Sequence, residues 1–357
     1  MFIKSCKTVY LILVAVFMSF TLNFNVLATD EIEDFTNLDL EDLMKIVIDQ
    51  NAVSALTSHI HKKGEWMVGY HYMYMDMDGN RDGTSDVSNA QVFAQGFMVV
   101  PTKMTMEMHM FSLMYALSDD LTVMAMTSYQ RRKMDHVRMM GMMVMPPFSA
   151  SSDGIGDTTF LANYVAYRTP GDKHILSVKG GISFPTGSID EKDFLPTGFA
   201  RLPYPMQLGS GTYDVKLGGT YQYFQDKWSL GVNTMGTIRT GENDNDYRLG
   251  NELELDTWYS YEWQEWLTTT VKLKGKSWGN IDGADPLLNP MMVPTADPDR
   301  RGGTRLDLLF DIELFAPSGK LQGNRLGIEL GKPIYENLEG PQLSTDWLGM
   351  VGWQWIF

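Results

Sequence analysis

Apolar and polar residues alternate with a period of two from about residue 64 to the C-terminus, and this pattern constrains the fold more than any other feature. In residues 66–75, for example, Trp66 and Val68 lie on one face and Met67 on the other. The same alternation returns in residues 213–223, 228–239 and 305–314. Because successive side chains of a β-strand point to opposite faces, each segment predicts a strand with one apolar and one polar face. Residues 158–168 fit either register, so their inward face stays open.

The connections between these segments alternate between short and long. Short ones fall at residues 118–120, 169–173, 225–227, 264–265 and 316–324. Long or polar ones fall at residues 76–103, 134–156, 186–210, 241–247, 280–303 and 336–343. Outer-membrane barrels have short periplasmic turns and longer external loops, whereas a soluble sandwich has no reason to sort its loops by end. We therefore predict an all-β fold: a transmembrane antiparallel β-barrel of about 12 strands, spanning residues 64–357, with both termini on the periplasmic side.

The last strand carries a more specific signal. Its aromatic and apolar residues share one face and end on the final residue of the chain: Trp347, Val351, Trp353, Trp355 and Phe357. A terminal Phe of this kind resembles the assembly signal of outer-membrane proteins, and the aromatic rings suit the lipid headgroup layer. The expected partners are therefore outer-membrane lipid, lipopolysaccharide and, through Phe357, the outer-membrane assembly machinery.

The N-terminal region is distinct from the barrel. Residues 1–28 have the basic start, apolar run and small-residue end of a cleaved signal peptide, with an uncleaved anchor as the alternative. The sole cysteine, Cys6, lies inside it. Residues 29–63 form an expected periplasmic segment with a short acidic helix at 34–46, whose Leu-Glu-Asp-Leu-Met stretch resembles one near the N-termini of TonB-dependent receptors. No plug domain of the needed length follows, so a simple tether is the preferred interpretation.

Composition excludes two classes of protein. The chain has 29 basic and 44 acidic residues and a net charge of −15, which argues against a nucleic-acid partner. After the signal, no run of 18 apolar residues occurs, so membrane-spanning helices are not expected. No cofactor is predicted.

Three short motifs resemble those of a known family. They are Gly154-Ile155-Gly156-Asp157, Phe184-Pro185-Thr186-Gly187 and the run from Gly209 to Asp214. They are similar to motifs of the outer-membrane "transporter" barrels named after the phenol meta-degradation pathway, over roughly residues 64–357. The resemblance implies fold and location, and it leaves the substrate open.

Strand parity predicts which residues line the barrel interior. Three neighbouring strands then carry an acid–base–acid ladder: Glu252, Glu254 and Asp256; Lys272, Lys274 and Lys276; Asp307, Asp311 and Glu313. One interpretation is a selective constriction for a polar solute. The other is a wall stiffened by ion pairs, each contributing about 0.2–1 kcal/mol. Both stay open for the ladder as a whole.

Methionine is concentrated in one region, since 18 of the 26 methionines fall between residues 67 and 145. The inward stripe comprises His71, Met73, Met75, Met77, Met104, Met106, Met108 and Met110. Thioether sulfur binds Cu(I) or Ag(I), so soft-metal handling is one hypothesis, and the Met-Asp-His sequence at 134–136 resembles segments of copper-tolerance proteins. Adaptable packing is the preferred alternative.

Two further metal motifs are weak. Asp78, Asn80 and Asp82 match the first half of a calcium loop, but Asn89 stands where its bidentate Glu belongs, so a polar external turn is preferred. His59 and His61 form an isolated pair before the first strand.

No serine, base and orienting group meet on the inferred strands, so we predict that the chain is not an enzyme. The sequence favours an outer-membrane channel or transporter for a small solute, with soft-metal (copper or silver) export or tolerance as the alternative. A closed structural barrel is the third possibility.

Overall fold

The computed structural model describes residues 61–141, 143–196 and 198–357. The expected signal peptide, the helix at 34–46 and His59 lie outside these residues. Within the described part, no helix combines the length and apolar character needed to cross a membrane.

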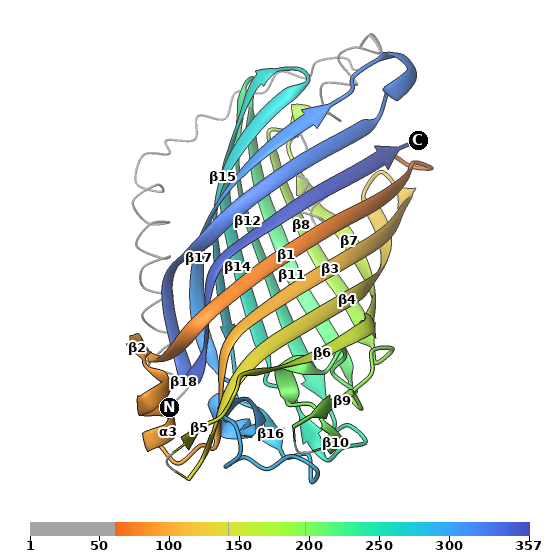
Figure 1. Cartoon of the computed structure of the whole chain (residues 1–357). Coiled ribbons are helices and arrows are strands. Elements are labelled where there is room, and N and C mark those ends of the chain that lie inside the picture. The colour runs from red at the N-terminus through yellow and green to blue at the C-terminus, as the bar shows by residue number, and fades with distance from the viewer. Residues whose placement is uncertain (1–60, 142, 197) are drawn as a thin grey trace. The chain divides into compact units, whose positions relative to one another are not determined.

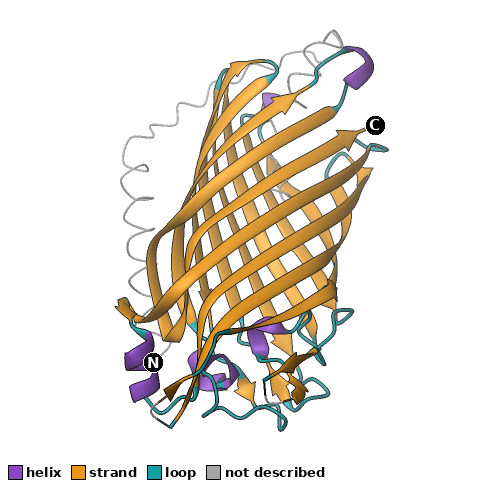
Figure 2. Cartoon of the chain, viewed as in Figure 1, coloured by secondary structure: helices purple, strands orange, loops and turns teal. Residues whose placement is uncertain are grey.

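Eleven assigned strands form one closed antiparallel ring (Figures 1 and 2). They are β1 (Trp66–Gly83), β3 (Val99–Ser118), β4 (Leu121–Met140), β7 (Thr158–Arg168), β8 (His174–Phe184), β11 (Tyr213–Gln225), β12 (Trp228–Thr240), β14 (Glu252–Gln264), β15 (Leu267–Trp278), β17 (Gly303–Phe315) and β18 (Asn324–Ile356). Neighbours in the sequence are neighbours in the sheet, and pairing of β18 with β1 closes the ring. The predicted all-β transmembrane barrel fold is confirmed.

Strand β18 supplies two spans of the ring. Its first part pairs with β17, from Arg325 to Leu338, and its second part pairs with β1, from Leu338 to Ile356. The chain therefore reverses near Gly340, and Figure 1 shows the two arms side by side. With β18 counted twice, the ring has about twelve spans, as predicted. At its end, the backbone N–H groups of Phe357 and Trp66 each donate to the other residue's carbonyl at 2.9 Å.

The inside–outside alternation follows the sequence pattern. On β3, Phe111 and Leu113 are 51% and 44% exposed, while Ser112 and Met114 between and beside them are buried. An apolar exterior of this kind suits hydrocarbon, because lipid-facing and interior residues alternate along barrel strands. The structure also settles the open register of β7: Phe160 and Tyr164 face outward, whereas Leu161 and Val165 lie inward. That strand was ambiguous because both of its faces carry apolar residues.

The two ends of the barrel differ, as the connection lengths predicted. One end has short turns, which include the 3₁₀ turns η2 (Pro170–Asp172) and η6 (Gly319–Leu321). The other end, lowest in Figure 2, carries the small elements and is called the long-loop end below. These elements are β2 (Ser85–Val87), α3 (Asn89–Ala94), β5 (Met143–Val144), β6 (Phe148–Ile155), β9 (Lys192–Leu195), β10 (Gly198–Arg201), η3 (Tyr204–Met206), β13 (Tyr247–Arg248), β16 (Asp282–Gly283), η4 (Pro294–Ala296) and η5 (Pro298–Arg300).

Three predicted loop boundaries are wrong. Strands β1, β3 and β4 extend well into the predicted loops 76–103 and 134–156, because hydrogen bonding continues past the last alternating residue. Residues 336–343 form a tight reversal within β18 instead of a long loop. Strand β6 pairs with β4 beyond β7, so β6 and β7 act as one span interrupted near Asp157.

Candidate functional site: the lumen beneath the long loops

The three glycine motifs meet at one carboxylate. Asp157 accepts hydrogen bonds from the backbone N–H of Gly187 at 3.0 Å and from the N–H and hydroxyl of Ser210, both at 2.8 Å. These two partners begin and end the connection between β8 and β11, here called the 185–212 loop. Asp157 therefore clasps both ends of this loop, a role that spacing alone did not reveal.

Glycine is required where the loop ends cross. A Cβ atom on Gly187 would lie 2.7 Å from the Cα atom of Gly209, and one on Gly209 would lie 2.4 Å from the carbonyl oxygen of Gly187. Neither backbone can move without breaking the Asp157 clasp. The two motif glycines thus permit a close crossing that any larger residue would prevent.

The 185–212 loop is anchored on the barrel wall at one methionine cluster. Leu202 and Met206 of the loop pack against Met104 and Met134 from β3 and β4, and all four are buried. Beside them, the Arg132 guanidinium donates to the backbone carbonyls of Pro205, at 2.7 Å, and Gln207. The loop is therefore held by apolar packing and by a charged donor together.

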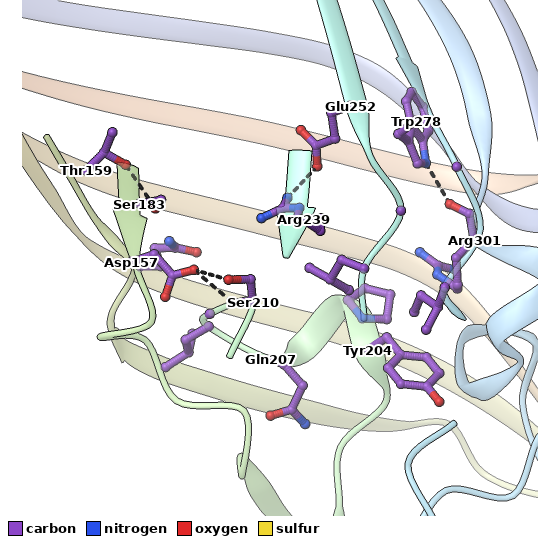
Figure 3. Close-up of a pocket in the computed structure, with 18 of the residues that line it drawn as sticks. Asp157, Thr159, Ser183, Tyr204, Gln207, Ser210, Arg239, Glu252, Trp278 and Arg301 are labelled. Carbon is purple, nitrogen blue, oxygen red and sulfur yellow. Dashed lines mark hydrogen bonds and ion pairs between the residues drawn. The ribbon is translucent and has the colours of Figure 1, made fainter. Parts of the chain in front are cut away.

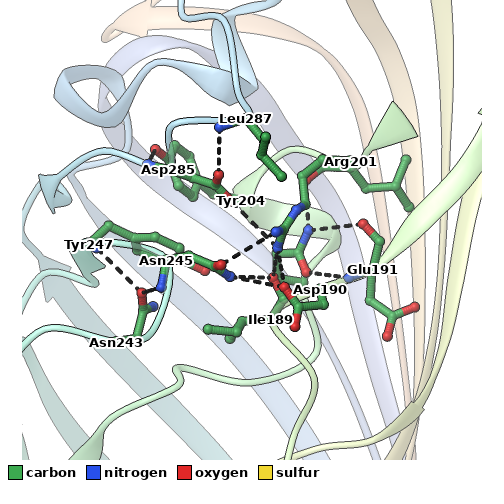
Figure 4. Close-up of polar contacts among 12 residues, drawn as sticks. Ile189, Asp190, Glu191, Arg201, Tyr204, Asn243, Asn245, Tyr247, Asp285 and Leu287 are labelled. Atoms are coloured by element: carbon green, nitrogen blue, oxygen red, sulfur yellow. Dashed lines mark hydrogen bonds and ion pairs between the residues drawn. The ribbon is translucent and has the colours of Figure 1, made fainter. Parts of the chain in front are cut away.

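Polar contacts tie this loop to the two neighbouring long loops (Figure 4). Arg201 donates to Asp190 at 2.5 Å and lies 3.5 Å from Asp285, while Asn245 donates to Asp190 at 3.2 Å. These hydrogen bonds, first that of Asn245, lower the pKa of the Asp190 carboxyl. The Tyr204 hydroxyl accepts from the Asp285 backbone at 3.1 Å. Connections 185–212, 241–251 and 279–302 thus form one linked assembly.

A cavity of about 480 Å³ lies between this assembly and the barrel wall (Figure 3). The loops contribute Tyr204 and Leu208, and the strands contribute Met108 and Glu252. Figure 3 shows Arg239 beside Glu252, which it contacts at 2.9 Å, and Arg301 beside Trp278. The cavity combines apolar and cationic side chains.

The nine predicted ladder residues occupy interior positions, but their partners differ in part from the prediction. Lys276 lies 2.9 Å from Glu252 and 3.3 Å from Glu254, and Lys274 lies 3.3 Å from Glu254. The first half of the ladder, between β14 and β15, is therefore present. Asp256 instead accepts from the Asn233 amide at 3.1 Å.

Between β15 and β17, the ion pairs seen among the described residues involve other partners than the predicted ones. Lys272 pairs with Glu329 of β18 at 2.6 Å. Asp307 pairs with Arg305 at 3.0 Å, and Glu313 with Arg325 at 3.3 Å. The two oxygens of the buried Asp311 have no hydrogen-bond partner within the described ranges. The inward acids and bases of β14, β15, β17 and the first arm of β18 are called the charged wall below.

Sequence reasoning missed four ion-pair partners of the ladder residues. Three of them, Arg305, Arg325 and Glu329, belong to the charged wall, and Arg239 lies beside it on β12. Arg325 and Glu329 have the same parity on β18, so assigning that strand's inward face could have found them. Arg239 falls on the polar face of the alternating residues 228–239, but its partner could not be predicted because the β12–β14 register was not known.

The predicted methionine stripe lies on the inner side of the barrel. In the backbone pairing of β1 with β3, three methionines of each strand stand opposite one another: Met73 and Met108, Met75 and Met106, and Met77 and Met104. His71 is fully buried, and its ring contacts the Gln354 side chain at 3.3 Å. These inward residues of β1 and β3, with Met124, Met126 and Met134 of β4, are called the methionine wall below.

The methionine wall has two packed ends. At the long-loop end, Met104 and Met134 receive the 185–212 loop. Near the short turns, Met67, Met114 and Met124 pack with Leu161. Between these clusters, Met106, Met108 and Met110 are only partly buried. The middle of the wall therefore faces the lumen.

The predicted calcium-loop half is not a loop. Asp78 and Asn80 lie within β1, and Asp82 lies at the start of the hairpin to β2. Asn80 is buried and donates to the carbonyl of Pro101 at 2.7 Å. Across the residues that the structure describes, no three His, Cys, Asp or Glu side chains gather as a metal site.

A closed antiparallel ring with an apolar exterior and a polar interior defines the class of outer-membrane β-barrels. The model of the family described as "Putative MetA-pathway of phenol degradation" matches residues 88–286. The chain belongs to this family, which confirms the resemblance of its glycine motifs.

Solved structures support the fold. The COG4313 outer membrane channel from Pseudomonas putida F1 is similar with a TM-score of 0.58 and 16% identity, covering 83% of this chain and 97% of that chain. A FadL homologue from Pseudomonas aeruginosa matches with a TM-score of 0.38 and 12% identity, over 87% of this chain and 95% of that one. No curated protein sequence matches the chain.

Proposed function

We propose that the protein is an outer-membrane channel or transporter that passes a small solute. The carrying observation is the cavity of about 480 Å³ that the clasped 185–212 loop leaves between itself and the barrel wall. An inward loop of this kind narrows a lumen and sets what can pass. The similar barrel from Pseudomonas putida is an outer membrane channel. The family therefore agrees with the prediction that the chain is not an enzyme.

The proposal includes a location and an orientation. A cleaved signal peptide delivers the chain to the outer membrane, where the short turns face the periplasm. Lipid contacts the apolar exterior, and lipopolysaccharide surrounds the long-loop end. The assembly machinery recognises Phe357, whose ring is 54% exposed and stacks on Trp355 with centroids 4.4 Å apart.

Single-channel recording of the purified protein in planar bilayers tests the channel. We expect discrete conductance steps for the wild type. Asp157→Ala should raise the step size several-fold, because it removes an acceptor of three hydrogen bonds that hold the loop inward. The matched control is Asp153→Ala, an exposed position whose carboxylate accepts from the Tyr129 hydroxyl and takes no part in the clasp. Absence of conductance and of solute flux in both the wild type and Asp157→Ala would refute the proposal.

Soft-metal handling is the second candidate, and the face-to-face methionines of β1 and β3 favour it. The processed chain would contain no cysteine, so bound Ag(I) would report on thioether and imidazole groups. Titration with Ag(I) should show binding that disappears when Met104, Met106, Met108 and Met110 are all replaced by Leu. If the quadruple variant binds as the wild type does, or if neither binds, the stripe is packing.

A further inference from the structure

The cavity beneath the long loops has a charge opposite to that of the whole chain. The chain carries a net charge of −15, yet the cavity is lined by four cationic and two anionic side chains. The cations are Arg132, Lys216, Arg239 and Arg301, and the anions are Asp157 and Glu252. A local excess of cations in a low-dielectric cleft attracts anionic solutes.

Both anions already have partners in the wall. Asp157 is committed to the loop clasp through Gly187 and Ser210. Glu252 is shared between Arg239, at 2.9 Å, and Lys276, also at 2.9 Å. The cavity's own carboxylates are therefore not available to neutralise its remaining cations.

Two of the cations have no carboxylate within ion-pair distance in the described part of the chain. Lys216 donates to the Thr237 hydroxyl, at 3.0 Å. The Nη1 atom of Arg301 is shielded from solvent and lacks a hydrogen-bond partner among residues 61–141, 143–196 and 198–357. Burial lowers the pKa of Arg301 to about 10, which leaves the guanidinium charged at neutral pH. A shielded donor without an acceptor is costly in free energy, and Arg301 itself also lines the cavity.

Part of the remaining lining is apolar, beside neutral polar side chains such as Gln130, Thr159 and Gln207. Met108, Leu208, Leu249 and Ile281 face the cavity, and so does the Trp278 ring, whose own N–H already donates to the Arg301 carbonyl at 2.6 Å. Bare inorganic anions gain nothing from such surfaces, whereas an organic acid buries its carbon skeleton there. The cavity therefore offers cationic donors and apolar contact within one space.

We propose that this cavity is the binding site for a small organic carboxylate with an apolar body. The carboxylate accepts hydrogen bonds from Arg301 and Lys216, and the body contacts the apolar lining beside Trp278. This inference rests on the proposed channel function and names the solute class that the channel selects.

The test uses three probes of matched shape on the purified, folded protein: cyclohexanecarboxylate, cyclohexylmethanol and cyclohexylmethylammonium. Calorimetric titration should show the acid binding at least about tenfold more tightly than either other probe, since a charge-assisted hydrogen bond is worth that factor or more. Arg301→Gln should weaken acid binding about tenfold. The control is Arg248→Gln, at the same end but paired with Asp282 and outside the cavity, which should bind as the wild type does.

The outcomes separate this inference from the channel itself. Equal binding of the three probes, or acid binding unchanged by Arg301→Gln, overturns the site, and the probe comparison needs no variant to fold. Ion conductance without any preference for the acid in binding leaves the channel standing and the site refuted. Acid binding without any conductance leaves the site standing and refutes the channel.

Discussion

The methionine wall and the charged wall solve the same problem, filling the inside of a barrel, with opposite chemistry. On the charged wall, Lys272 and Glu329 lie 2.6 Å apart with side chains less than a tenth exposed, so a buried charge there needs an oppositely charged partner. On the methionine wall, Met73 and Met108 stand opposite each other and need only apolar contact. Directional partners make a wall specific, whereas flexible thioethers make it adaptable.

The two walls also serve the loops differently. The methionine wall packs against Leu202 and Met206 of the 185–212 loop, because flexible unbranched side chains can adapt to an irregular loop surface. The charged wall holds the barrel strands to one another, and Glu252, its member nearest the long-loop end, reaches the cavity. Since Met108 lines the same cavity, the solute would meet both walls at once.

The largest expected effect is loss of one partner on the charged wall. Lys272→Met leaves the Glu329 carboxylate buried without its cation and should cost about 3–5 kcal/mol of stability. Urea unfolding in detergent, followed by the heat-dependent gel shift of the folded barrel, measures this. Lys103→Met is the control, because its pair with Asp76 is 42% exposed on the lysine side and should cost less than about 1 kcal/mol. If both variants lost the same unfolding free energy, the buried pair of the charged wall would be no more important for stability than the exposed pair.

A second test concerns the short-turn end of the charged wall, where His61 is buried near Arg325. Burial first, and the Arg325 charge second, lower the pKa of His61 from 6.5 to about 4. As the pH falls, the imidazole of His61 is therefore protonated in the unfolded chain before it is protonated in the folded chain. Its effect on the free energy of unfolding is that full stability is present above pH 6.5 and is lost as the pH falls toward 4. The loss amounts to about 3 kcal/mol.

Unfolding free energies measured between pH 7 and pH 4 check the sign. His61→Gln should flatten the decline over this range, and Lys62→Gln at the neighbouring exposed position should leave it unchanged. An identical pH dependence for His61→Gln and wild type would show that the acid-labile group lies elsewhere.

A third, smaller effect is expected where the methionine wall meets the loop. Leu202→Ala opens a cavity against Met104 and Met134 and should cost about 2 kcal/mol, the low end for such a truncation because a loop can partly relax. The observable is faster protease cleavage within the 185–212 loop while the barrel stays folded. Leu321→Ala, an exposed residue at the short-turn end, should not alter cleavage. Unchanged cleavage in Leu202→Ala would mean that the clasp alone holds the loop.

The sequence was sufficient to predict the barrel and the inward face of most strands, but not which inward side chains contact one another. Alternation sets which face of each strand is inward, so Glu254, Lys274 and Met106 could be assigned to the interior from parity alone. Pairing also depends on register and side-chain reach, which is why Lys272 meets Glu329 rather than a β17 acid. The clasp was hidden for a related reason: Asp157, Gly187 and Ser210 are brought together only by the loop's crossing.

The smallest expected effect is a conservative change in the middle of the methionine wall. Met106 faces Met75 across the strands and is only partly buried, so Met106→Leu should change the free energy of unfolding by less than about 1.5 kcal/mol. Conductance should also stay at the wild-type value, because volume and polarity are preserved. The informative partner is Lys274→Met on the charged wall, a change of similar size that removes the cation lying 3.3 Å from Glu254 and should cost more. If Met106→Leu proved as costly as Lys274→Met, the methionine wall would be as partner-specific as the charged wall, and a dedicated role for its sulfur atoms would follow.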